Sequence, residues 1–130
     1  MNESIEFHDS TVSCVRAVGG DLVVRFSKAY VHRSTGDPGV SPGVGVIRSA
    51  ELVFFEASSF GDLARAHGEI SDGYIAFEGQ RFSLLALPFA SSAAVTAELV
   101  FQSGASLTVS AASARCEASG AARFVDSFPG

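Results

Sequence analysis

The 130-residue chain contains no tryptophan, one methionine, two cysteines and a single lysine, Lys28. No apolar run approaches the roughly 18 residues that a membrane-spanning helix requires, so we expect no such span. Without tryptophan the chain also lacks the aromatic platform typical of sugar-binding surfaces, because phenylalanine has no polar group to present at a wet surface. A carbohydrate-binding module is therefore disfavoured.

Positive charge is also scarce. Nine lysines and arginines stand against fourteen acidic residues, which gives a net charge of −5, and the arginines are scattered singly along the chain. Nucleic acids and anionic membrane surfaces both select for a surplus of basic residues. We therefore expect neither a nucleic-acid partner nor a membrane partner.

The length is that of one domain, so residues 1–130 are expected to fold as a single unit. The N-terminus carries no apolar segment of a secretory signal, and the excess of arginine over lysine is typical of GC-rich bacterial coding. We expect a cytoplasmic bacterial protein. In a reducing cytosol Cys14 and Cys116 are expected to be free, with a disulfide between them as the alternative.

Alternation of apolar and polar residues, broken by glycine turns, predicts an all-β fold. We expect an antiparallel β-sandwich, or a flattened barrel, of about eight strands with little helix. The clearest hairpin turns at residues 19–21. Its second strand is expected to have a bulge or the sheet rim at Lys28. One face of that strand is expected to consist of Leu22, Val24, Phe26 and Tyr30.

Residues 33–45 contain four glycines and two prolines, which predicts a long loop. The next segment, 46–57, has apolar residues on both faces, as a central strand covered on both sides or a strand at an interface does. Two further hairpins are expected to turn at 79–80 and 103–104, with a short helical turn near 62–66. The tail, with Phe124, Val125 and Phe128, is expected to dock as an edge strand or a capping segment.

No motif identifies a catalytic, metal or cofactor site. Residues 39–43 match the G-x-S-x-G nucleophile elbow, but Pro42 has no N–H to donate to an oxyanion hole. His8, His32 and His67 lack the spacing of a metal site. We therefore predict no catalytic residue, no metal ligand and no cofactor. The alternative is a site of histidines and carboxylates, which requires at least two histidines to converge.

The opening Phe7-His8-Asp9-Ser10 precedes a strand, a Gly-Asp turn and a second strand, and residues 99–109 (LVFQSGASLTV) again read as strand, polar glycine turn and strand. Both segments resemble small bacterial all-β proteins of unassigned function. Some of those proteins are predicted to be immunity proteins that neutralise toxins of neighbouring bacteria. The resemblance implies an all-β fold and a protein partner, and it assigns no functional residue.

The expected function is thus non-catalytic binding of another protein, immunity-like or self-associating. The alternative is a small hydrolase or isomerase that uses the histidine and carboxylate set. An acidic chain suits a basic partner, because complementary charge speeds encounter and selects partners. The expected binding residues are Tyr30, His32, Arg33 and Asp37 near the start of the long loop, with His8 and Asp9 as second candidates.

Overall fold

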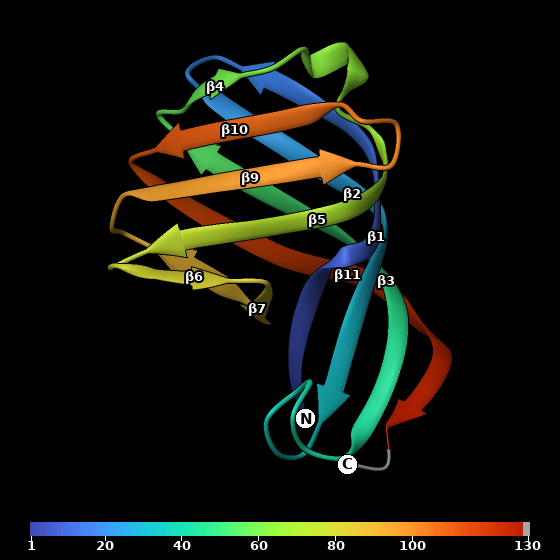
Figure 1. Cartoon of the computed structure of the whole chain (residues 1–130). Coiled ribbons are helices and arrows are strands. Elements are labelled where there is room, and N and C mark those ends of the chain that lie inside the picture. The colour runs from blue at the N-terminus through green and yellow to red at the C-terminus, as the bar shows by residue number, and fades with distance from the viewer. Residues whose placement is uncertain (129–130) are drawn as a thin grey trace.

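The computed structural model describes residues 1–128 and consists of antiparallel strands in one curled sheet that forms a half-barrel (Figure 1). The predicted all-β class is confirmed. The strands are β1 (Asn2–Val18), β2 (Asp21–Ser34), β3 (Gly43–Phe55), β4 (Ser58–Phe60), β5 (Gly68–Phe77), β6 (Gln80–Phe82), β7 (Leu84–Leu87), β8 (Phe89–Ser91), β9 (Val95–Phe101), β10 (Ser106–Ala111) and β11 (Ser113–Phe128). Their order is β4-β10-β9-β5-β1-β2-β3-β11-β8, with β6 beside β5 and β7 beside β1.

The 11 strands exceed the predicted eight because the segment after the turn at 79–80 is divided into β6, β7 and β8, and because β4, with three residues, is too short to show an alternation. The predicted helical turn is present as a 3-10 helix, η1 (Leu63–Arg65), and the Asp62 carboxylate caps it by accepting a 2.9 Å hydrogen bond from the Ala64 N–H. Among residues 1–128, no helix is long and apolar enough to cross a membrane.

The predicted hairpin of β1 and β2 is confirmed, and so is the bulge at Lys28. Three steps along β2, from Phe26 to Ala29, match two steps along β3. An extra residue reverses the alternation of faces, so Phe26 is buried in the core and the next core residues are Ala29 and Val31. The expectation that Tyr30 shares a face with Phe26 was therefore wrong.

The loop between β2 and β3 is shorter than predicted and covers residues 35–42. Gly43 and Gly45 belong to β3, and neither has a positive φ. A β-carbon on Gly45 would collide with the Tyr30 hydroxyl and would lie 3.3 Å from Cε2 of Phe128. These glycines were misread as turn residues: at Gly45 the small residue leaves room for aromatic rings that cover the strand.

The core lies inside the curl of the sheet. The largest fully buried side chains include Phe7, Phe26, Phe54 and Phe101. β3 lies between β2 and β11, and its Phe54 and Val53, which point to opposite faces, are both buried. The prediction that this segment is a central strand with both faces covered is confirmed.

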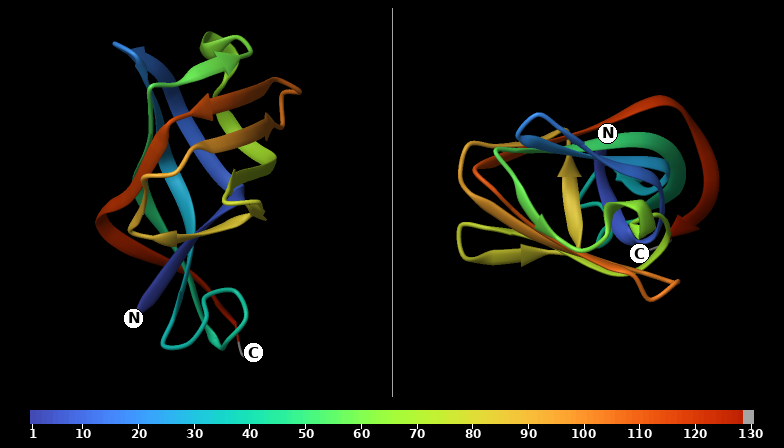
Figure 2. Two further views of the ribbon diagram at one scale, coloured as in Figure 1. Left: turned by 90° about the vertical axis from the view of Figure 1, so that its left-hand side faces the viewer. Right: turned by 90° about the horizontal axis from the view of Figure 1, so that it is seen from above.

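The ends of β1, β2, β3 and β11 nearest the chain termini project together from the curled sheet, and β7 pairs with residues 3–6 of β1 where they leave it (Figures 1 and 2). We name this part the extension, and it consists of residues 2–6, 29–34, 43–48 and 123–128. β11 pairs with β8 only at Ala114–Cys116 and with β3 along its length. Its tail is therefore an edge strand, as predicted.

The two cysteines are both free, and they differ in environment. Cys14 is partly exposed, whereas Cys116 is buried opposite Leu52 of β3. Burial, with a smaller effect of the Glu117 charge, raises the pKa of Cys116 to about 12. Since the thiolate is the reactive form of cysteine, Cys116 is protected in the folded chain.

We expect a disulfide reagent such as DTNB to modify one thiol of the native protein and the second thiol only upon unfolding. The Cys14→Ser variant should remain unlabelled until denaturant is added, and absorbance of the released thiolate follows both reactions. Prompt reaction of two thiols in the native protein would contradict the buried position of Cys116.

Candidate functional site

The structure places Tyr30 and His32 in an aromatic group on one face of the extension. The His32 ring meets Tyr30 edge-on, with centroids 5.3 Å apart, and stacks on Phe128 at 5.0 Å. His32 is 9% exposed, and neither of its ring nitrogens has a hydrogen-bond partner among residues 1–128. Its Nε2 lies 3.5 Å from Oε1 of Glu6 on β1.

A bulge in β1 brings His8 and Asp9 close to Glu6, the carboxylate that lies beside His32. Glu6 pairs with Tyr30, and the next paired residue of β1 is Thr11, so residues 7–10 are looped out. The fully buried Ser10 holds this bulge, because its hydroxyl donates to the Glu6 carbonyl and accepts a 2.9 Å hydrogen bond from the Tyr30 N–H. Asp9 adopts a left-handed conformation (φ 72°).

Within the bulge, His8 Nδ1 lies 3.2 Å from Asp9 Oδ2. One ligating atom from each of Glu6, His8 and Asp9 lies within 4.8 Å of the others. We name Glu6, His8, Asp9 and His32 the bulge cluster. Two of the three histidines thus gather about one carboxylate, which the histidine and carboxylate alternative required.

The neighbourhood of the bulge cluster is negatively charged. Burial raises the pKa of Tyr30, and the charges of Asp126, Glu6 and Asp9 raise it further. The Tyr30 phenol is therefore neutral and able to donate a hydrogen bond at physiological pH. No basic side chain forms an ion pair with these carboxylates in the described part of the chain apart from the two histidines.

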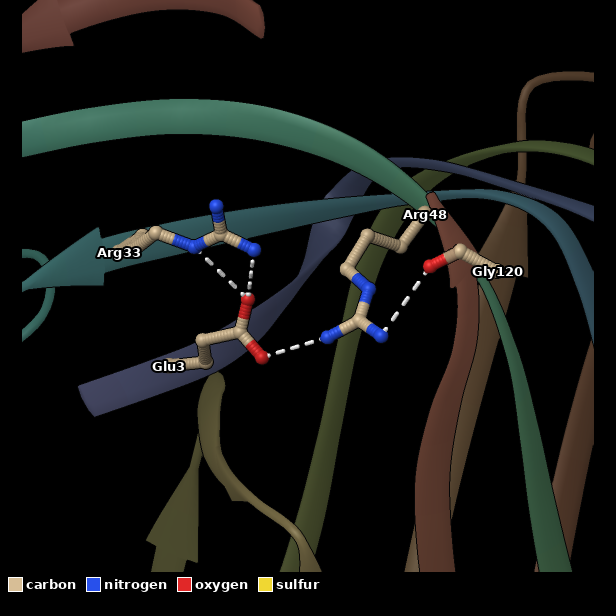
Figure 3. Close-up of polar contacts among 4 residues, drawn as sticks. All are labelled: Glu3, Arg33, Arg48 and Gly120. Carbon is tan, nitrogen blue, oxygen red and sulfur yellow. Dashed lines mark hydrogen bonds and ion pairs between the residues drawn. The ribbon is translucent and has the colours of Figure 1, made fainter. Parts of the chain in front are cut away.

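Arg33 is engaged elsewhere, in an ion-pair network with Glu3 and Arg48 (Figure 3). The Arg33 Nε and Nη2 donate to one oxygen of Glu3 at 3.0 and 2.7 Å, and Arg48 Nη1 donates to the other at 2.7 Å. Arg48 Nη2 also donates to the Gly120 carbonyl at 3.3 Å. The network ties β1, β2, β3 and β11 together.

Asp37 lies in the loop at 35–42, apart from the bulge cluster. Its carbonyl accepts hydrogen bonds from the Val40 and Ser41 N–H groups at 3.0 and 2.8 Å, and its own N–H donates to the Ser41 hydroxyl at 3.0 Å. The Ser41 hydroxyl thus stabilises the loop. His67 is exposed and follows η1, at the opposite end of the molecule from the extension (Figure 1).

Shallow hollows elsewhere on the sheet hold no comparable set of groups. One of about 400 Å³ is lined by nine residues of which Glu78 alone is titratable. Another of about 370 Å³ contains the exposed Arg25–Glu51 ion pair and four serines. Two further residues complete the site: Glu6, which no sequence pattern had marked, and Phe128, which was expected only as part of the docking tail.

Comparisons with protein-family models, with curated proteins and with solved structures give no match. The similarity to immunity proteins therefore stays a prediction, and the function is argued from the geometry alone.

Proposed function

We propose that this protein functions by binding protein, and that it binds a second copy of itself through the open edge of β11. The observation that carries the proposal is the length of that edge. From Glu117 to Phe128, β11 pairs with β3 on one side, and no strand within residues 1–128 pairs with its other side. An unpaired edge offers backbone N–H and C=O groups to a further strand.

Apolar exposure marks the same edge. Phe124 is 65% exposed and Val125 is 47% exposed, although they lie side by side near the end of a long strand. Pairing with another strand would cover part of both side chains and satisfy the free backbone groups. Two register shifts, after Ser119 and after Phe124, limit the regular stretch. Such bulges favour a closed pair of chains over an open fibre.

The charges of this edge favour a second copy as the occupant. Arg123 and Asp126 pair with residues of β3 that are two apart, so their side chains share one face. An antiparallel pair of identical edges places Arg123 of each chain beside Asp126 of the other. A two-fold interface repeats that contact twice, as isologous interfaces do.

Sedimentation velocity tests this assignment. We expect a concentration-dependent dimer, and we expect Arg123→Asp or Asp126→Arg to raise the dimer Kd by about tenfold, because each change turns two attractions into repulsions. The double variant Arg123→Asp/Asp126→Arg should recover the dimer. Arg16→Asp is the control: it makes the same change in net charge as Arg123→Asp, near the turn between β1 and β2 and away from the β11 edge, and it should dimerise like the parent. A chain that stays monomeric at all concentrations, or a double swap that fails to recover the dimer, would contradict the proposal.

Acid–base catalysis is the second candidate, and the approach of His8 and His32 to Glu6 is the observation that favours it. Against it, the ring nitrogens of His32 are buried, which leaves no room beside them for an organic substrate, as opposed to a single ion. We therefore favour protein binding.

We further propose a bacterial, cytoplasmic setting, on the composition of the chain. We favour the flattened barrel over the sandwich, because β7 and β8, joined at Pro88, pair with β1 and β11 respectively.

A further inference from the structure

The bulge cluster is a set of four ligand-type side chains that the association through β11 does not use. Glu6 and His8 are alternate residues of β1, whereas Asp9 would point to the opposite face of a regular strand. The bulge and the left-handed backbone at Asp9 bring its carboxylate to within 3.2 Å of His8 Nδ1. The irregular backbone therefore gathers groups that a plain strand would separate.

His32 provides an independent observation. Its ring is held between Tyr30 and Phe128 and is 9% exposed, yet both ring nitrogens lack a hydrogen-bond partner in the described part of the chain. Buried polar groups without partners are rare, because removing them from water costs free energy that nothing returns. Its Nε2 lies 3.5 Å from Glu6 Oε1 without forming a hydrogen bond to it. A ligand bound beside Glu6 would give that nitrogen a partner.

Two donor-atom distances in the cluster match those between the ligands of a small cation, and the ligand atoms of Glu6, His8 and Asp9 all lie within 4.8 Å of one another. In a tetrahedral zinc site with bonds of about 2.0–2.1 Å, adjacent donor atoms lie about 3.3 Å apart. The donor pairs Glu6–His32 and His8–Asp9 are already separated by 3.5 and 3.2 Å. His8 and Asp9 are half-exposed, so an ion reaches the cluster from solvent and needs no opening of the core.

We propose that Glu6, His8, Asp9 and His32 bind a divalent transition-metal ion of the zinc class. Two imidazoles and two carboxylates form a donor set that suits Zn²⁺ and its neighbours, whereas Ca²⁺ and Mg²⁺ prefer oxygen ligands alone. His32 is the inner ligand, oriented by the two aromatic rings, and the bulge residues close the site from the solvent side. None of the four proposed ligands belongs to β11, although Phe128 of β11 stacks on the His32 ring.

Isothermal titration of the chelator-treated full chain with Zn²⁺ should show one saturable site per chain. His8→Ala, a change at an exposed residue that leaves the core intact, should weaken zinc binding by about 10- to 100-fold, and Glu6→Gln and Asp9→Asn should do likewise. His67→Ala removes a histidine at the far end of the molecule and should bind as the parent does. Equal affinity of the His8→Ala variant and the parent would overturn the proposal, as would the absence of saturable binding.

Cobalt(II) distinguishes the proposed ligands from a cysteine site. Four-coordinate cobalt absorbs strongly in the visible region, and we expect that spectrum without the near-ultraviolet thiolate band that Cys14 would produce. His32→Leu should abolish the four-coordinate spectrum. A thiolate band that disappears in Cys14→Ser, or a visible spectrum that His32→Leu leaves unchanged in a folded chain, would overturn the assignment of the ligands.

Discussion

Replacement of Phe7 by alanine is expected to lower the free energy of unfolding by about 3–5 kcal/mol, the range for a large buried aromatic residue. Phe7 is 1% exposed, and its ring lies 6.4 Å from that of Phe26 in the core. The backbone of β5 also packs closely against Phe7, because a β-carbon on Gly73 would lie 3.2 Å from the β-carbon of Phe7. The cavity left by alanine therefore has rigid walls. Denaturation by urea, followed by circular dichroism, measures the loss.

Two further variants serve as controls for this prediction. Phe60→Ala removes the same side chain where it is 83% exposed, and surface changes of this kind stay within about 0.5 kcal/mol. Phe7→Leu keeps most of the apolar contact and should lie between the two. A Phe7→Ala variant as stable as Phe60→Ala would show that the bulge segment does not rest on the core.

The regular part of the fold was predictable because its signal is local. The hairpins at 19–21, 79–80 and 103–104 each combine alternating strands with a glycine turn, and the structure contains all three. Alternation at period 2 reports a strand wherever one face is buried. A strand of three residues carries no such pattern, so β4 was missed, and so was the division of the segment after the turn at 79–80 into three short strands.

The bulges could not be placed with the same certainty, and they decide which side chains meet. One inserted residue reverses every later face of a strand, so the bulge at Lys28 moved Tyr30 out of the core face. No composition marks the second bulge, at residues 7–10. Gly43 and Gly45 misled in another way, because composition alone does not distinguish a turn glycine from one that lies against a neighbouring backbone, as Gly43 does, or beneath an aromatic ring, as Gly45 does.

Most residues of the candidate site were predicted from the sequence, but the contacts between them were not. Tyr30, His32, His8 and Asp9 were singled out for their position near turns, and the structure brings these four together. Their common neighbour, Glu6, resembles a solvated residue of an edge strand when the sequence is read alone. Its role follows from the pairing of Glu6 with Tyr30, which is a property of register.

The Glu3→Gln variant is expected to lose about 2–4 kcal/mol of unfolding free energy, because removing one partner of a poorly exposed ion pair leaves the other charges uncompensated. The carboxylate of Glu3 is 16% exposed and accepts hydrogen bonds from both Arg33 and Arg48. Glutamine has nearly the same shape and no charge, so two guanidinium groups then repel each other across it. Urea denaturation again measures the difference.

Glu51→Gln is the matched control, since the Arg25–Glu51 pair is 56% and 41% exposed and such pairs contribute about 0.2–1 kcal/mol. Similar losses in the two variants would show that strand pairing and packing alone hold the extension. A larger loss for Glu3→Gln has a further consequence, because Arg48 also binds the Gly120 carbonyl at the bulge that precedes Arg123. The same variant should then weaken dimerisation. The ion-pair network and the open edge of β11 would be coupled through that one hydrogen bond.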